Sequence, residues 1–320
     1  MTAPDPGRTG EILYSFLSIL FEGAPYILVG TLLSGFIDAF LPAKLLDRML
    51  PKNKVLSTLA AGFMGLIFPV CECAVVPVMR RLVQKGLPIS CAMTYLLSAP
   101  IINPIVIIST WTAFHNPSDK SDMTGIMMTV GRISLGYLIA VIVGLAMLRK
   151  KPSDILIKSI ADGITNVDDD NGNAPKIALD AKLIHAMRTA MRDFLDTAMY
   201  FTIGILITAV FNTQIDQTKL QLVAGNQFLA APALMGLAYI LALCSTSDAF
   251  IAAPMVAFGF AAKLAFLVFG PMLDIKLTFM YASVFRRKFL VGLCIALFLL
   301  SAVLSGPWSS LMQKIFVHTP

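Results

Sequence analysis

The stretch from Phe68 to Pro77 places two thiols and a carboxylate, those of Cys71, Glu72 and Cys73, among apolar residues. Cysteine sulfur is a soft ligand, so two thiols two positions apart can hold one thiophilic centre when the backbone between them is extended. In a regular helix the same side chains would point about 200° apart. Prolines near both ends of the stretch remove backbone donors and disturb a helix. We therefore predict a broken helix that binds a soft substrate.

The composition places this stretch in a membrane. Of 320 residues, 57% are hydrophobic and only 14% are charged, which leaves too little polar surface for a soluble globule. The five cysteines lie in apolar segments, unlike those of a secreted disulfide scaffold, so we expect reduced thiols. Lys and Arg flank the apolar runs, and the net charge of +6 thus indicates membrane orientation, with no nucleic-acid partner. We expect a multi-pass protein of the bacterial inner membrane, embedded in lipid.

Glu72 is the sharper indication of function. A carboxylate at membrane depth costs several kcal/mol, with estimates starting near ~3 kcal/mol, unless it is paired or faces an interior cavity. We expect Glu72 to exchange a proton or bind a cation. Two plainer readings stay open: the cysteines act as small apolar side chains, or Glu72 bonds only to the broken backbone.

A related polar set follows in the second half of the chain, at Cys244-Ser245-Thr246-Ser247-Asp248. Two such breaks facing each other would form one site at the middle of the membrane. Asp248 is therefore the second candidate for binding an ion or a proton. The alternative is that it only caps a helix.

Proline also interrupts two other apolar runs beside a polar side chain. Ser98 and Asn103 flank Pro100 in the third run, and Asp274 follows Pro271 in the seventh. Carbonyls freed at such breaks can line a substrate or ion pathway, whereas the alternative is a proline kink satisfied by neighbouring helices.

Two cations at membrane depth, Arg132 and Lys276, are candidates to pair with carboxylates, and the sequence does not assign the pairs. We expect no catalytic residue, no metal ligand and no cofactor. The expected substrate-binding residues are Cys71, Glu72, Cys73, Cys244, Thr246, Ser247, Asp248, Ser98, Asn103 and Asp274.

Eight apolar runs dominate the chain, and a polar stretch separates the fourth from the fifth. We predict an all-α integral membrane protein with a first membrane half (1–148), a polar cytoplasmic linker (149–192) and a second membrane half (193–320). The runs are Ile12 to Leu41, Val55 to Met79, Pro88 to Phe114, Thr124 to Leu148, Phe194 to Phe211, Gln227 to Phe258, Leu264 to Phe285 and Phe289 to Leu304.

Charge distribution favours re-entrant segments. If all eight runs crossed fully, the basic turns at 44–54 and 286–288 would lie on the wrong side of the membrane. If the second and sixth runs instead enter, break and return, every basic cluster becomes cytoplasmic and each half has three full spans. The second half is then inverted relative to the first, as in many secondary transporters. Eight ordinary spans remain the alternative.

The two halves also resemble each other weakly. An offset of 171 to 174 positions sets Cys71 beside Cys244 and Asn103 beside Asp274, among a few other matches. We expect an internal duplication, with coincidence among Gly- and Ala-rich helices as the alternative.

Broken spans with carboxylates, and a chain without a phosphate-binding G-x-x-x-x-G-K-[ST] loop, favour a secondary transporter over an enzyme. An intramembrane thiol oxidoreductase and a membrane scaffold are the competing readings. Neither the electropositive setting nor the C-x-x-C spacing typical of catalytic thiols is evident. The oligomeric state stays open, and a homo-oligomer is compatible with the sequence.

The strings F-P-V-C-E-C-A-V-V-P-V, R-R-L-V-Q-K-G-L-P, S-A-P-I-I-N-P and C-S-T-S-D-A-F together resemble the predicted permeases of the ArsP/YraQ type. The resemblance covers nearly the whole chain. It implies a permease, and because some members export trivalent organoarsenicals through membrane cysteines, it implies that Cys71 and Cys73 bind a thiophilic or metalloid substrate.

Overall fold

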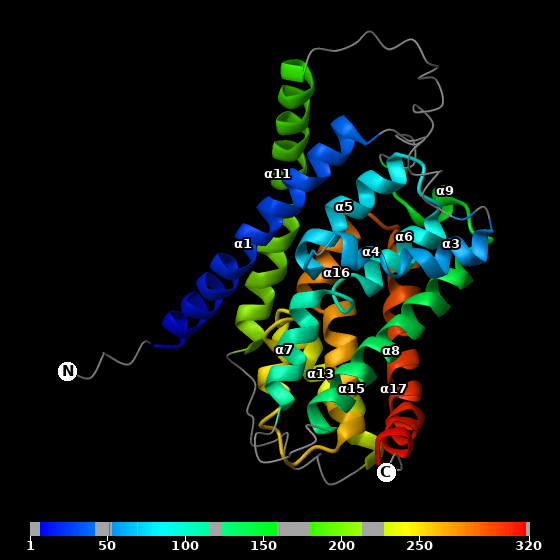
Figure 1. The fold of residues 1–320 in the computed structure, drawn as a ribbon. Coiled ribbons are helices and arrows are strands. Elements are labelled where there is room, and N and C mark those ends of the chain that lie inside the picture. Colours follow the sequence, from blue (N-terminus) through cyan, green and yellow to red (C-terminus); the bar gives the residue numbers. More distant parts are fainter. Residues whose placement is uncertain are drawn as a thin grey trace.

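The computed structural model describes residues 7–41, 51, 53–68, 70–115, 123–158, 160, 179–212 and 227–317. Helices make up nearly all of these residues (Figure 1), and the extended pairing among them is one isolated bridge between Leu156 and Phe285. The helices are α1 (Arg8–Phe40), α3 (Lys54–Ala61), α4 (Met64–Ile67), α5 (Glu72–Gln84), α6 (Ile89–Ser98), α7 (Pro104–Phe114), α8 (Met123–Ala146), α9 (Pro152–Ile155), α11 (Leu179–Asn212), α13 (Gln227–Leu241), α14 (Asp248–Ala252), α15 (Phe260–Met272), α16 (Ile275–Ala282) and α17 (Arg287–Val317).

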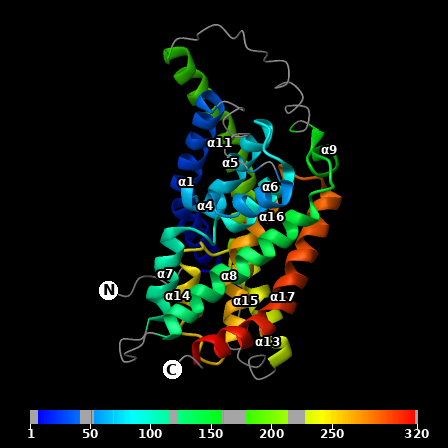
Figure 2. The ribbon, with the colours of Figure 1, turned by 45° about the vertical axis from the view of Figure 1, so that its right-hand side comes forward.

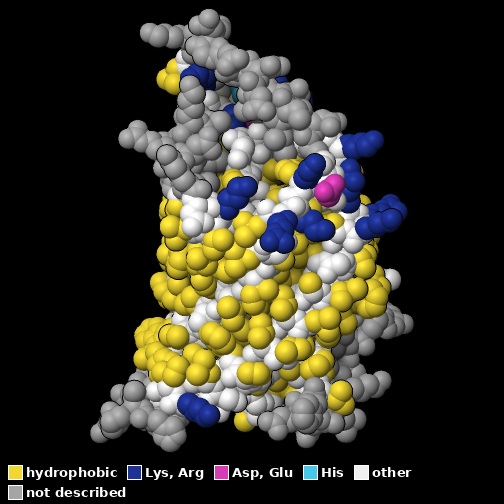
Figure 3. Space-filling view, turned by 90° about the vertical axis from the view of Figure 1, so that its right-hand side faces the viewer, with side chains coloured by type: hydrophobic (Ala, Val, Ile, Leu, Met, Phe, Trp, Pro, Cys, Tyr) yellow, Lys and Arg dark blue, Asp and Glu magenta, His cyan; other side chains and the backbone are white. Residues whose placement is uncertain are grey.

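Five helical stretches of the described chain are long and apolar enough to cross a membrane, which confirms the all-α multi-pass prediction. A wide hydrophobic belt covers the face of the molecule in Figure 3, and most of the Lys and Arg side chains on this face gather near one end of the belt. The five stretches are Thr9–Phe40, Thr124–Ala146, Leu179–Phe211, Phe260–Ala282 and Arg287–Phe316.

The most deeply buried of these stretches is Phe260–Ala282, which comprises α15 and α16. Helices α8, α13 and α17 pack against α15, and α11 packs against α16. Helix α1 lies along α11 and α5 at the outside of the bundle (Figures 1 and 2). A side chain on α16 is therefore positioned by helices from both halves of the chain.

The predicted breaks are confirmed. The second apolar run forms α3, α4 and α5, the third forms α6 and α7, and the sixth forms α13 and α14. The seventh run is interrupted at Leu273 and Asp274, whose extended backbones separate α15 from α16. Pro69 lies outside the described residues.

The chain just before the second run and the start of the third run lie together at one end of the molecule. Lys54, Pro88 and Lys150 line one hollow there, together with Ser57 and Ser90. Lys150 follows the spanning helix α8, so the run enters beside the end of α8 and returns to the same place. It does not cross the bundle (Figure 1).

The basic clusters also gather at that end. Arg286 donates from its backbone N–H to Ile155 O over 2.9 Å, which joins the 286–288 cluster to the segment after the 149–151 cluster. Lys85 donates to the backbone carbonyl of Asp38 over 2.6 Å, at the end of α1. The described clusters therefore share one end of the molecule, and the expectation that this end is cytoplasmic stays a prediction. Positions 44, 48 and 52 lie outside the described residues.

The sixth run starts from the opposite end. Helix α13 begins away from α9 (Figure 2), and α15 starts near the far end of α7, where Lys263 Nζ lies 5.8 Å from the centroid of the Phe114 ring. The two broken runs thus approach the middle of the molecule from opposite ends. The inverted duplication and the three chain divisions stay predictions.

Two helix ends differ from the apolar runs. Helix α11 begins at Leu179, inside the 149–192 stretch that we expected to be a polar linker, and α17 continues to Val317, beyond Leu304. An apolar run predicts only the part of a helix that lies within the membrane. The helix itself can continue beyond the run where another helix packs against it. Here Ala186 and Ala190 of α11 lie within close range of Gly35 of α1.

Candidate functional site

The start of α5 carries the first part of the site. Cys71 has an extended backbone (φ −75°, ψ 172°) and precedes the first residue of the helix, Glu72. A carboxylate in the first turn is favoured by the positive end of the helix dipole. Because Cys71 lies outside the helix and Cys73 inside it, both thiols line the same cavity despite their spacing.

Glu72 is held in a buried ion pair. Its side chain is only 1% exposed. Lys276 Nζ donates to Glu72 Oε1 over 3.3 Å, and the Ser245 hydroxyl donates to Oε2 over 2.9 Å. Both carboxylate oxygens are therefore satisfied, and α5 of the first half is joined to two segments of the second half.

Lys276 also holds the loop between α13 and α14. It donates to the carbonyl of Ala242 over 2.9 Å and to that of Leu243 over 3.4 Å. Ala242 has a φ of +47°, a left-handed conformation that costs a non-glycine residue of the order of 1–3 kcal/mol. The loop keeps this strained backbone because a buried ammonium binds its carbonyls.

Arg132 of α8 fixes the other end of the loop. Its guanidinium donates to both oxygens of Asp248, over 2.7 and 3.0 Å, and to the carbonyl of Ser245 over 3.1 Å. A further bond of 2.7 Å reaches the hydroxyl of Thr110. Arg132 and Asp248 are 1% and 3% exposed, so this pair lies in the interior.

These contacts form one polar chain across the middle of the molecule. It runs from Lys276 through Glu72, Ser245 and Arg132 to Asp248. Breaking a buried ion pair by removing one partner typically costs about 3–5 kcal/mol, because the other charge is left without compensation. The chain therefore fixes how the two broken segments face each other.

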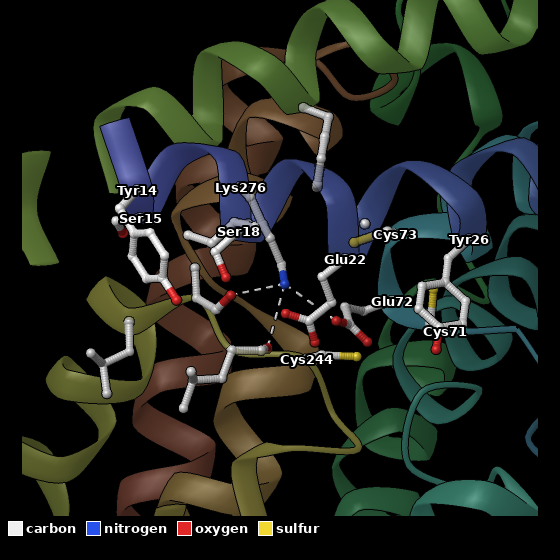
Figure 4. A pocket seen from close by; sticks show the side chains of 16 residues that line it. Tyr14, Ser15, Ser18, Glu22, Tyr26, Cys71, Glu72, Cys73, Cys244 and Lys276 are labelled. Carbon is white, nitrogen blue, oxygen red and sulfur yellow. Dashed lines mark hydrogen bonds and ion pairs between the residues drawn. The ribbon is translucent and has the colours of Figure 1, made fainter. Parts of the chain in front are cut away.

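A cavity of about 290 Å³ opens beside this chain. Figure 4 shows the thiols of Cys71, Cys73 and Cys244 around it, with Glu22 and Tyr26 reaching in from α1. The volume lies near the lower limit for small-ligand pockets, ~300 Å³. A small solute fits such a cavity, between soft sulfur atoms and a buried ion pair.

Four of the ten expected site residues line this cavity: Cys71, Glu72, Cys73 and Cys244. Thr246 and Ser247 bond to Cys244, through its sulfur over 3.4 Å and its carbonyl over 3.1 Å.

The remaining expected residues make structural contacts. Asp248 pairs with Arg132, and Asp274 caps α16 by accepting from the Leu277 N–H over 2.6 Å. Asn103 caps α7 in the same way, and Ser98 donates to the Gly62 carbonyl over 2.9 Å, at the break between α3 and α4. Neither Ser98 nor Asn103 lines the cavity of Cys71.

Sequence reasoning left several cavity residues out. Lys276 was expected to pair with a carboxylate but not to line the site, and Glu22 and Tyr26 were not singled out. A signal for Glu22 exists, since it follows Ser15 and Ser18 at intervals of seven and four positions, which places all three on one face of α1.

Among the described residues no three His, Cys, Asp or Glu side chains are close enough together to hold a metal ion. The cysteines are all free thiols. The arrangement fits a solute that one or two sulfur atoms contact.

Comparison with known proteins agrees with this architecture. A protein of Bacillus subtilis (strain 168), UPF0718 protein YcgR, is 34% identical over 275 residues, covering 86% of this chain and 88% of its own. A protein of Streptococcus mutans serotype c, named as a subunit of a two-component membrane permease complex, is 36% identical over 287 residues, covering 89% of this chain and 91% of its own. No solved structure matches. The sequence profile of the predicted-permease family ArsP_1 matches residues 8–306, and the chain belongs to this family of membrane permeases.

Proposed function

We propose that this permease is a secondary transporter for a small thiophilic solute, such as a trivalent organoarsenical, and that the cavity beside Glu72 is its substrate site. The observation that carries the proposal is that Cys71, Cys73 and Cys244, which come from both halves of the chain, line one cavity. We propose export as the direction of transport, as in those members of the resembling family that export trivalent organoarsenicals.

The chemistry of the lining supports a soft substrate. Thiol sulfur prefers soft centres, while carboxylates and carbonyls prefer hard cations. Glu72 has both oxygens engaged by Ser245 and Lys276, so the thiols, together with Glu22 and Tyr26 of α1, are the groups that can contact a solute. Cys71 and Cys244 are half-buried, which leaves their sulfur atoms within reach of the cavity.

Coupling to ions or protons is the second part of the proposal. Glu72 and Asp248 are carboxylates in the membrane-embedded interior, and each is paired with a cation from another helix. A solute that disturbs the Glu72–Lys276 pair would disturb the polar chain to Asp248 as well. Such a chain is a route by which substrate binding could change the conformation of both broken segments.

Assembly with another subunit is compatible with this function. The Streptococcus mutans relative is named as part of a two-component complex, and α1 exposes many apolar side chains, including Phe21, Leu28 and Val29. Co-purification of the tagged chain from its native membrane, followed by mass determination, distinguishes a single chain, a homo-oligomer and a two-component complex.

The experiment that tests the substrate site is transport of phenylarsine oxide, a trivalent organoarsenical, in everted membrane vesicles. We expect Cys71→Ser and Cys73→Ser to lower uptake at least tenfold. Cys294→Ser is the matched control, because Cys294 lies at a separate apolar groove between α13, α15 and α17. Equal uptake by all three variants at equal protein amounts would contradict the assignment.

A further inference from the structure

Asp274, which lies beside Lys276, adds a third carboxylate to the two ion pairs of the buried polar chain. Three carboxylates, those of Glu72, Asp248 and Asp274, face only two cations, Lys276 and Arg132, and all five side chains are at most 4% exposed. An uncompensated charge at membrane depth is costly. A proton on one carboxyl group makes the set neutral.

Hydrogen bonding distinguishes the three carboxylates. Glu72 receives a donor on each oxygen, and so does Asp248. Asp274 Oδ1 accepts from the Leu277 N–H, but Asp274 Oδ2 is buried with no hydrogen-bond partner, and Lys276 Nζ stands 3.5 Å from it. The charged form of Asp274 is therefore the least well solvated of the three.

The fold does not need a carboxylate at position 274. Asn103 caps α7 by accepting from the Ile105 N–H over 3.0 Å, at the place in the first half that the internal offset matches to Asp274. Asn and Asp are about equally good helix caps. Capping thus accounts for Oδ1 of Asp274, whereas Oδ2 takes no part in the cap and has Lys276 Nζ, 3.5 Å away, as its ion-pair partner.

We propose that Asp274 carries a proton on Oδ2 in this conformation and releases it when Lys276 shifts from Glu72 to Asp274. Lys276 lies between the two carboxylates, 3.3 Å from Glu72 Oε1 and 3.5 Å from Asp274 Oδ2, so a small movement of its ammonium group exchanges one partner for the other. The step is a simple ionisation, in which the neutral carboxyl gives a carboxylate and one proton.

The cavity offers the trigger. Lys276 and Glu72 line the same cavity as the thiols, so a solute bound there contacts the ion pair directly. Asp274 also interacts electrostatically with Tyr239 of α13 and Tyr281 of α16, and Cys294 of α17 does so with both tyrosines. Both tyrosine hydroxyls are bonded elsewhere, Tyr239 to Thr278 and Tyr281 to the Met272 carbonyl. Lys276 is thus the charged group whose ammonium can compensate the Asp274 carboxylate once the proton has left.

Infrared spectroscopy tests the proton without any substrate. The purified chain in phosphatidylethanolamine and phosphatidylglycerol vesicles is compared at neutral pH with Asp274→Asn and with Asp274→Ser, which also caps a helix. We expect the wild type minus variant spectrum to contain the C=O stretch of a neutral carboxyl group. A difference spectrum that contains carboxylate bands instead would overturn the proposal.

The coupling part rests on the proposed function and needs a transport assay with phenylarsine oxide in the same vesicles. We expect Asp274→Asn to retain exchange of the solute across the membrane. An imposed pH gradient should stimulate transport by this variant at least tenfold less than it stimulates transport by the wild type. Unchanged stimulation in this variant would overturn coupling through Asp274. Failure of the wild-type chain to move phenylarsine oxide would instead contradict the proposed substrate. The infrared result would then still show whether Asp274 is protonated.

Discussion

The hydroxyl of Ser245 donates to Glu72 Oε2 over 2.9 Å and joins residues 173 positions apart in the sequence. Through this bond the broken segment before α5 meets the loop before α14. The carbonyl of the same Ser245 accepts from Arg132, so one residue connects the two buried ion pairs. Ser245 was not among the residues that the sequence singled out as binding substrate.

Replacing Ser245 by Ala should destabilise the protein and impair transport. Glu72 Oε2 would lose its donor, and an unsatisfied buried acceptor costs about 1–3 kcal/mol, more for a charged group. Thermal unfolding in detergent measures the loss. Ser247→Ala is the control, since its half-buried hydroxyl only bonds to the Cys244 carbonyl. Equal melting temperatures for the two variants would contradict the role of Ser245.

Arg132 and Asp248 should behave as a coupled pair. Arg132→Met leaves Asp248 buried without its cation, which we expect to cost about 3–5 kcal/mol. The double variant Arg132→Met with Asp248→Asn removes both charges and should recover a large part of that loss. A double-mutant cycle of unfolding free energies gives the coupling. Additive effects of the two substitutions would show that the pair contributes nothing in the membrane.

Gly204 should tolerate no side chain. A Cβ atom there would lie 2.7 Å from the Cα of Lys276, so α11 would have to move away from α16 at the substrate cavity. We expect Gly204→Ala to cost about 1–3 kcal/mol and to lower transport. Gly292→Ala on α17 is the matched control, because no atom lies within 4 Å of the added Cβ. A stable, active Gly204→Ala variant would contradict this helix packing.

The placement of the second apolar run predicts a labelling pattern. In a background without native cysteines, Lys54→Cys should be protected from a membrane-impermeant maleimide in intact cells, and should react once the membrane is opened. His115→Cys, at the far end of α7, should label from outside. External labelling of Lys54→Cys would mean that the run crosses the membrane fully.

Much of the fold and part of the site could be predicted from the sequence. Prolines and charged residues within apolar runs are local signals, and they located the breaks at Cys71, at Cys244 and at Asp274. Partner choice is not local: Lys276 and Glu72 are 204 positions apart, and Arg132 and Asp248 are 116 apart. Only packing of α16 and α8 against the breaks selects these pairs.

Glu22 illustrates a second limit. It lies in an apolar helix without a break, and the only local signal is its spacing from Ser15 and Ser18 on the same face of α1. It becomes a cavity residue because α1 packs on α5, where Gly30 allows close approach to Ala74. Such residues are found from the packing between helices, not from a motif.

The measurement that most directly tests the shared cavity is protection of Cys244 by a solute bound at Cys71 and Cys73. Purified protein is treated with a maleimide, with and without prior phenylarsine oxide, and labelling of each cysteine is quantified by peptide mass spectrometry. The structure predicts that phenylarsine oxide slows labelling of Cys244 at least tenfold and leaves Cys294 unchanged, and that Cys71→Ser with Cys73→Ser abolishes the protection. Equal labelling of Cys244 with and without phenylarsine oxide would contradict a common site.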